Sequence, residues 1–396
     1  MGGLRGLTRL VAFLKISVLV RILEPVEFGI FGIASILLAF LEILTDTGVN
    51  VFLIQEKKGI EKYINSAWFI SIIRGFIISL ILLVLAKPIS IFFNSPNSYR
   101  VILLTTIVPF LKGFINPSII KFQIELEFKK EFNFRLIVFS IDTFITIFLA
   151  IILKKAEGIV LGMAFGVIVE ILFSWIFIYP RPRLEFEWST IKKFLSRGRW
   201  ITIASIFEYF FQHVDDIMVG KLLGSAQLGF YQVSYRVSTL PISEGGEVIS
   251  KVVFPIYTKI SNNKDKLKKT YFKVFYLTSL PTIFFGLFLI IFTRQFISLF
   301  LGSSWLEIVN VIKVLAVFGI IRAISGSSSV LFLSIKKQEY VSVVTFVSTL
   351  FLGISIFPLI SKYGLVGAGY STLIGSISAL PFIFYFIKKE LYGKRS

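Results

Sequence analysis

Charged residues lie inside long apolar stretches of this sequence, where each is costly unless it faces a partner or a polar cavity. Cations in such places can hold an anionic group through charge-assisted hydrogen bonds. The candidates are Lys15, Arg74, Lys112, Arg236, Lys313 and Arg322. Buried carboxylates can bind and release protons. The candidates are Asp142, Glu170, Glu208 and Asp215. Both kinds of group suit a polar cavity. The first hypothesis is therefore a cavity that binds a ligand or an ion.

The alternative is that opposite charges pair with each other and only hold neighbouring elements together. Arg74 or Lys112 could pair in this way with an acidic residue such as Asp142 or Glu170. The acidic residues at similar depth also include Glu42, so that partners are available. Sequence spacing leaves both interpretations open.

The stretches that carry these charges are predicted to cross a membrane. Of the 396 residues, 55% are hydrophobic and 16% are charged, and the mean hydropathy is +0.83, which excludes a water-soluble fold of this length. A helix of about 20 apolar residues crosses the hydrocarbon core and satisfies its own backbone groups. The sequence therefore predicts an all-α membrane protein with about twelve transmembrane helices. Their approximate ranges are 7–23, 28–50, 64–86, 100–120, 133–153, 158–179, 199–220, 228–255, 271–293, 306–333, 340–361 and 364–387.

The net charge of +19 is distributed unevenly between the connecting segments. With both termini in the cytoplasm, 28 of the 42 Lys and Arg residues fall in cytoplasmic segments and 8 in outside loops. This bias follows the positive-inside rule and predicts a multi-pass protein of the inner (cytoplasmic) membrane of the cell with both termini cytoplasmic. It also accounts for the charge without a nucleic-acid partner.

The sequence lacks the groups that several kinds of chemistry need. It contains no Cys and a single His, His213, so that disulfides, thiolate nucleophiles and His/Cys metal sites are not expected. No Gly-x-Ser-x-Gly, Walker A or GxGxxG motif occurs. We therefore expect a protein that is not an enzyme and that uses no metal and no cofactor.

Two segments recur about 200 residues later in the chain. "VRILEPVEFGIFG" (20–32) resembles "VGKLLGSAQLGFY" (219–231) at a shift of 200 residues, and "GIVLGMAFGVI" (158–168) resembles "GLVGAGYSTLI" (364–374) at a shift of 206. These matches predict a duplicated six-helix unit whose copies run in the same direction through the membrane. We expect two pseudo-symmetric six-helix bundles around a central cavity. Their ranges are 1–180 for the N-terminal lobe, 181–198 for a basic cytoplasmic linker and 199–396 for the C-terminal lobe.

The predicted helix at 158–179 begins with glycines at four-residue spacing, Gly158, Gly162 and Gly166. Small residues at this spacing let two helices approach closely. We interpret the glycines as a packing surface and not as part of a sugar-binding site.

One segment carries a resemblance to a known family. In "DDIMVGKLLGSAQLGFYQVSYRV" (215–237), an Asp in the seventh predicted helix is followed by Gly five residues later, then by a basic-apolar-Leu-Gly turn and a Gly-x-Tyr that opens the eighth helix. Together with "RILEPVEFGIFGIA" and "DTGVNVFLIQ" near the N-terminus, this pattern resembles the Wzx-like polysaccharide and oligosaccharide flippases of the multidrug/oligosaccharidyl-lipid/polysaccharide exporter superfamily. The resemblance covers most of the chain, although members often have fourteen spans.

The resemblance implies a flippase that moves a polyprenyl-pyrophosphate-linked oligosaccharide from the cytoplasmic to the outer leaflet by alternating access, for polysaccharide biosynthesis. On this hypothesis the six cations contact the pyrophosphate headgroup, because Arg and Lys suit phosphate oxygens. The four carboxylates become candidates for ion coupling. Membrane lipids are expected partners, and so are a polysaccharide polymerase and glycosyltransferases of the same pathway.

Two other functions compete with this hypothesis. A multidrug or organic-cation exporter of the same superfamily would need acidic and aromatic cavity walls, and the basic residues at depth disfavour it. A membrane glycan polymerase or sugar transferase would need catalytic residues in sizeable loops, whereas the outside loops here are short. We therefore favour the flippase.

Overall fold

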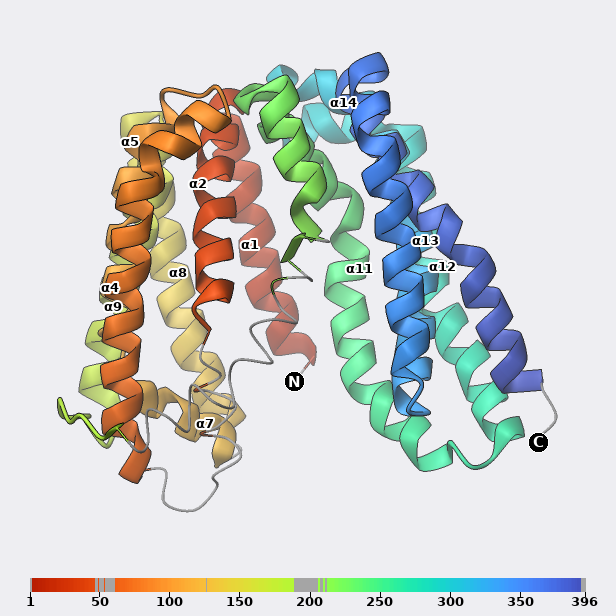
Figure 1. Ribbon diagram of the computed structural model, residues 1–396, viewed down its shortest axis with the longest axis horizontal. Coiled ribbons are helices and arrows are strands. Elements are labelled where there is room, and N and C mark those ends of the chain that lie inside the picture. The colour runs from red at the N-terminus through yellow and green to blue at the C-terminus, as the bar shows by residue number, and fades with distance from the viewer. Residues whose placement is uncertain are drawn as a thin grey trace. The chain divides into compact units, whose positions relative to one another are not determined.

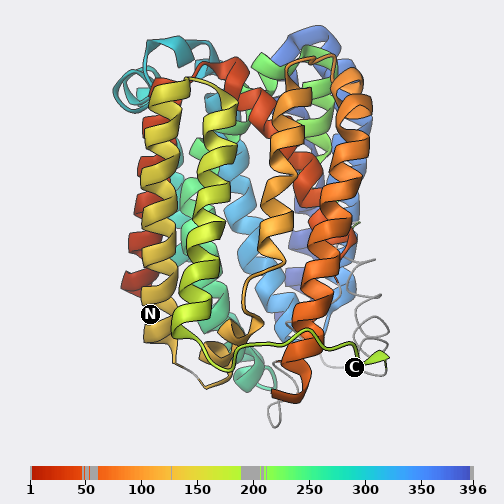
Figure 2. The ribbon, with the colours of Figure 1, turned by 90° about the vertical axis from the view of Figure 1, so that its left-hand side faces the viewer.

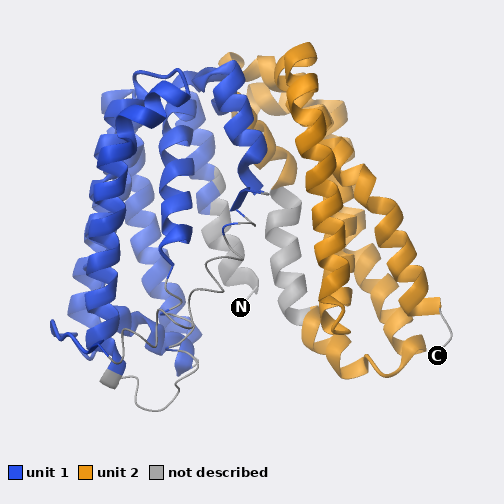
Figure 3. Cartoon of the chain, in the orientation of Figure 1, with its two compact units in different colours: residues 1, 3–229 blue, residues 2, 230–396 orange. Residues whose placement is uncertain are grey.

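The computed structural model describes residues 2–46, 49, 53, 61–125, 127–188, 206, 209–210 and 212–392. All regular secondary structure in these residues is helical (Figure 1). The helices form two compact units, which comprise essentially residues 3–229 and 230–396 (Figure 3).

The first unit contains long helices and, between α4 and α8, several short ones. Its elements are α1 (Gly2–Ile22), α2 (Pro25–Leu44), α4 (Glu61–Phe92), α5 (Ser98–Thr105), α6 (Ile107–Lys112), η1 (Pro117–Ile120), α7 (Lys121–Ile124), α8 (Phe128–Leu153) and α9 (Ala156–Phe177). Helix α2 begins with Pro25, whose fixed φ suits the first turn. Helix α9 begins where the Glu27 carboxylate accepts a hydrogen bond from the backbone N–H of Ala156 (2.6 Å), which places a negative charge at the positive end of the helix dipole.

The second unit also consists of helices. Its elements are α11 (Ser225–Ile260), whose first turn belongs to the first unit, α12 (Lys264–Phe300), η2 (Ser303–Ile308), α13 (Val309–Ser334) and α14 (Gln338–Tyr392). The α14 segment is broken at Gly364, which has a positive φ of 56° that favours glycine. The break falls between the two helices that the sequence predicts at 340–361 and 364–387.

The expected all-α membrane fold is confirmed. Among the described residues, seven helices are long and apolar enough to cross a membrane, and the bent pair Ser98–Lys112 and Pro117–Ile124 adds an eighth. Because Gly364 divides α14 and other predicted spans fall partly on residues outside the described ranges, the observed helices are consistent with twelve spans.

The fourth predicted span, 100–120, is not one continuous helix. The chain bends by 69° between Lys112 and Pro117. The buried Asn116 side chain accepts a hydrogen bond from the Ser118 N–H and donates to the carbonyl oxygens of Ile178 (3.1 Å) and Pro180 (3.3 Å). These hydrogen bonds connect the bend to the end of α9. The bend also places Lys112 at the C-terminal end of α6.

Helices α8 and α9 pack side by side along their length (Figure 2). A side chain at Gly158 would lie 2.9 Å from the Leu149 carbonyl oxygen, and one at Gly166 would lie 2.8 Å from Asp142; Gly162 is in equally close contact with Thr146. The glycines thus form the packing surface that their spacing predicts.

The duplicated turns pack against each other. Helices α2 and α11 begin at Pro25 and Ser225, positions that match at the shift of 200 residues. A side chain at Gly29 would strike the Ser225 carbonyl, and one at Gly229 would strike the Pro25 carbonyl. The contact is reciprocal, which supports the duplication. The first compact unit extends to Gly229, and the lobe boundary at 181–198 stays a prediction.

Candidate functional site

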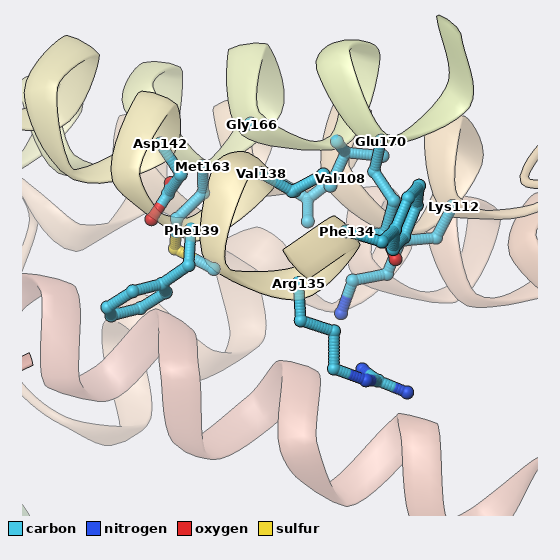
Figure 4. A pocket seen from close by; sticks show the side chains of 11 residues that line it. Val108, Lys112, Phe134, Arg135, Val138, Phe139, Asp142, Met163, Gly166 and Glu170 are labelled. Atoms are coloured by element: carbon cyan, nitrogen blue, oxygen red, sulfur yellow. The ribbon is translucent and has the colours of Figure 1, made fainter. Parts of the chain in front are cut away.

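A cavity of about 420 Å³ lies in the first unit between α6, α8 and α9 (Figure 4). Most of its wall is apolar, but four of the residues that line it carry a charge. The lining residues are Val108, Lys112, Phe134, Arg135, Val138, Phe139, Asp142, Met163, Gly166, Val167 and Glu170. Three of the residues that the sequence singles out, Lys112, Asp142 and Glu170, are therefore brought together in one place.

The helix geometry explains why charged residues from three helices meet here. Arg135 and Asp142 are seven residues apart on α8 and so lie on the same face two turns apart. Gly166 lets α9 approach at the level of Asp142. Lys112 is the last residue of α6, where the bend ends the helix. The side chains of Lys112 and Arg135 extend to the same side of the cavity (Figure 4).

Asp142 is paired with Lys15 of α1. Lys15 Nζ lies 2.6 Å from Asp142 Oδ2, and the two side chains are only 15% and 17% exposed. The ammonium also lies 6.0 Å from the centroid of the Phe139 ring, and Thr146 Oγ1 donates to Asp142 Oδ1 (3.4 Å). This part of the wall is thus neutralised by a mostly buried ion pair.

Lys112 and Arg74 meet the C-terminal end of α2. Lys112 Nζ lies 2.7 Å from Glu42 Oε1. Arg74 donates through Nη2 to the backbone oxygen of Glu42 (2.5 Å) and through Nε to Thr45 Oγ1 (3.1 Å). The sequence suggested that Arg74 or Lys112 would pair with Asp142 or Glu170. Among the described residues, the two cations instead contact Glu42.

Glu170 projects into the cavity from α9. The cations Lys112 and Arg135 line the same cavity. Arg135 also holds Glu131, with its Nε 2.9 Å from Glu131 Oε1. Sequence reasoning missed Arg135, because it lies at the edge of the predicted span at 133–153. The available signal was the seven-residue spacing from Asp142.

The remaining cations belong to the second unit and are not among the residues that line this cavity. Arg322 of α13 donates to the Tyr235 hydroxyl and lies 5.9 Å and 5.7 Å from the ring centroids of Tyr235 and Phe318. Lys313 of α13 and Arg236 of α11 are both exposed.

Two carboxylates remain from the predicted set. Asp215 is buried, with 5% of its surface exposed, and its Oδ1 accepts a hydrogen bond from the Asp216 backbone N–H (3.0 Å). Glu208 lies outside the described residues. Within the described ranges, no three His, Cys, Asp or Glu side chains are grouped so that they could hold a metal ion.

The long apolar helices define a multi-pass membrane protein, and a charged cavity lies between α6, α8 and α9. A family model described as "Polysaccharide biosynthesis protein" matches residues 18–310. The chain therefore belongs to the polysaccharide biosynthesis protein family, as its sequence resemblance indicates.

Two curated relatives are similar to the chain over most of its length. It is 28% identical over 404 residues to an uncharacterized membrane protein in the cps region of Klebsiella pneumoniae, and the match covers 98% of this chain and 81% of the relative. It is 24% identical over 319 residues to the lipopolysaccharide biosynthesis protein WzxC of Escherichia coli K12, a match that covers 79% and 64% of the two chains.

Solved structures share the fold over nearly the whole chain. A multidrug resistance MATE family transporter of the MOP superfamily matches with a TM-score of 0.75 at 15% identity, covering 97% of this chain and 94% of the other. The lipid II flippase MurJ matches with a TM-score of 0.73 at 17% identity, covering 97% and 89%. At these identities the likeness establishes the fold.

Proposed function

We propose that the chain is a flippase that carries a polyprenyl-pyrophosphate-linked oligosaccharide from the cytoplasmic to the outer leaflet by alternating access. The observation that carries this proposal is the cavity lined by Lys112 and Arg135 among helices long enough to cross a membrane. Membership of the polysaccharide biosynthesis protein family supports it. So do relatives named as a lipopolysaccharide biosynthesis protein and a putative O-antigen transporter.

The physical task explains why such a cavity is needed. The headgroup carries phosphate charge and many hydroxyls, which cannot enter hydrocarbon without losing their hydration. A polar path replaces part of that hydration, while the polyprenyl tail stays in the lipid. Lys112 and Arg135 offer N–H donors, the groups that bind phosphate oxygens most strongly.

In this proposal some of the other predicted residues stabilise the cavity, and the rest stay candidates for binding or ion coupling. Arg74 fixes the end of α2 beside Lys112, and Lys15 balances Asp142 inside the wall. Arg236, Lys313 and Arg322 stay candidates for headgroup contacts, and Asp142, Glu170, Glu208 and Asp215 stay candidates for ion coupling.

The setting of the protein belongs to the same proposal. We place the chain in the cytoplasmic membrane with both termini in the cytoplasm, because the basic residues favour that side. It would act without catalysing a covalent step, and its partners would be the lipid-linked glycan, membrane lipids, and a polymerase and glycosyltransferases of the same pathway.

An export assay in cells tests the role of the cations. In a strain that depends on this chain for surface polysaccharide, Lys112→Ala and Arg135→Ala should each lower export about tenfold, since each removes a charged contact worth about 1.4 kcal/mol or more. Lys269→Ala, which removes an exposed cation far from the cavity residues in sequence, should export at the parent rate. Normal export by both cavity variants at normal membrane levels would show that the cavity does not hold the headgroup.

A multidrug exporter of the same superfamily is the alternative, since a MATE transporter shares the fold. An organic cation would be repelled by Lys112 and Arg135. Drug-resistance assays in a pump-deficient host separate the two functions, and we expect no gain of resistance.

A further inference from the structure

Two ion pairs involve residues of the cavity, and they differ in how far their side chains are exposed. In the pair of Lys15 with Asp142 the side chains are 15% and 17% exposed, whereas in the pair of Lys112 with Glu42 they are 41% and 33% exposed. A mostly buried pair is hard to separate, because each charge would be left in a poorly solvated place. A more exposed pair can exchange partners at less cost. The Lys112–Glu42 pair is therefore the exchangeable one.

The backbone of Glu42 is held in place independently of its side chain. Arg74 Nη2 donates to the Glu42 carbonyl oxygen (2.5 Å), and Arg74 Nε donates to Thr45 Oγ1 (3.1 Å). Thr45 Oγ1 in turn donates to the Leu41 carbonyl oxygen (2.7 Å). Arg74 also sits at the negative end of the α2 dipole, which favours a cation there. The carboxylate can thus leave Lys112 by rotation of its side chain while the end of α2 stays fixed.

A carboxylate and a phosphate oxygen compete for the same donors. Lys112 offers a compact ammonium with three N–H groups, and Glu42 occupies it at 2.7 Å. Resting on the function proposed above, we infer that Glu42 is a built-in counter-ion of the cavity: it holds Lys112 when no cargo is bound and yields it to the pyrophosphate of the headgroup.

This arrangement has a consequence for affinity and for release. Each bound headgroup must displace Glu42, so the carboxylate lowers the affinity of the cavity for anions. When the headgroup leaves, Glu42 takes Lys112 back and assists the departure. Glu42 is in this sense a positioning residue, which acts on the cargo through Lys112.

Substitution of Glu42 isolates its effect. Glu42→Gln removes the competing charge and keeps a hydrogen-bond acceptor of the same size. Its matched control is Glu127→Gln. Glu127 Oε1 lies 2.6 Å from Lys130 Nζ, and the Glu127 carboxylate is 33% exposed, the same fraction as that of Glu42. Neither Glu127 nor Lys130 lines the cavity. A double variant, Glu42→Gln with Lys112→Gln, tests whether the effect passes through Lys112.

The measurement is titration of the purified full-length protein with inorganic pyrophosphate, with the thermal transition of each variant as a check of folding. Glu42→Gln should bind pyrophosphate about fivefold more tightly than the parent, the scale expected for a partly exposed ion pair. Glu127→Gln should bind like the parent, and the double variant should bind no more tightly than the parent. Equal binding by Glu42→Gln and the parent, an equal gain in Glu127→Gln, or no pyrophosphate binding by any folded variant would overturn the inference.

A transport assay separates this inference from the function on which it rests. If the parent moves a lipid-linked glycan across vesicles but Glu42→Gln binds pyrophosphate like the parent, the counter-ion idea fails and the flippase stands. If Glu42→Gln binds more tightly but the parent moves no glycan, the counter-ion stands and the flippase fails.

Discussion

At the scale of single residues, the charges inside this protein are organised around partners that are distant in sequence. Lys15 pairs with Asp142, 127 residues away, and Lys112 pairs with Glu42, 70 residues away. The residue types at depth singled out Lys112, Asp142 and Glu170, which line one cavity. They could not predict the pairs, because pairing depends on which helices become neighbours after folding.

The Lys15–Asp142 pair gives a prediction at this scale. Lys15→Met leaves a mostly buried carboxylate without its cation and should lower the free energy of unfolding by about 3 kcal/mol. Replacing both residues, as Lys15→Met with Asp142→Leu, should recover most of that loss because no charge is then stranded. Unfolding followed by tryptophan fluorescence of the purified variants measures both effects. A single variant as stable as the parent would mean that the pair contributes nothing.

At the scale of the elements, the sequence anticipated most of the long helices, with ends that differ by up to seven residues, as at α12 (Lys264–Phe300), which was predicted at 271–293. It predicted a span at 306–333 where α13 covers Val309–Ser334, and one at 158–179 where α9 covers Ala156–Phe177. It failed at 100–120, where hydropathy continues through a bend. The bend depends on hydrogen bonds from Asn116 to the end of α9, and a tertiary contact of this kind leaves no periodic signal in the sequence.

The α8–α9 contact gives a prediction at this scale. Gly162→Ala would place a methyl group against the backbone of Thr146 and should cost about 2 kcal/mol of stability, the usual effect of overpacking. Gly353→Ala on α14 is the control, since nothing lies within 4 Å of the added group, and it should be neutral or stabilise the helix by up to about 1 kcal/mol. Thermal unfolding of the two variants compares them directly. Equal transition temperatures would show that α9 can move away from α8 without loss.

At the scale of the whole molecule, charge separates the two ends of the second unit. One end carries the C-terminus of α11, the N-terminus of α12, the α13–α14 turn and the end of α14. Its basic residues are Lys259, Lys264, Lys266, Lys268, Lys269, Lys273, Lys336, Lys337, Lys388 and Lys389. The other end carries Arg294 and Lys362. From the positive-inside rule we expect the first end to face the cytoplasm.

The absence of Cys from the sequence makes this orientation easy to test. Ser261 lies between α11 and α12. The cysteine of the Ser261→Cys variant should react with a membrane-impermeant maleimide only after the cells are permeabilised. Ser303 lies between α12 and α13. The cysteine of the Ser303→Cys variant should react with the same maleimide in intact cells. Labelling of the two positions in the reverse pattern would contradict the assigned orientation.

Movement of a lipid-linked glycan between leaflets is the activity that defines a flippase, and it can be measured with the purified protein. The purified protein would be reconstituted into liposomes that hold a fluorescent polyprenyl-pyrophosphate oligosaccharide, and the fraction in each leaflet would be followed with a membrane-impermeant quencher. The flippase account predicts exchange between leaflets that depends on the protein, exceeds that of protein-free liposomes and falls in the Lys112→Ala variant. No exchange above protein-free liposomes, from a preparation that still shows a cooperative thermal transition, would contradict it.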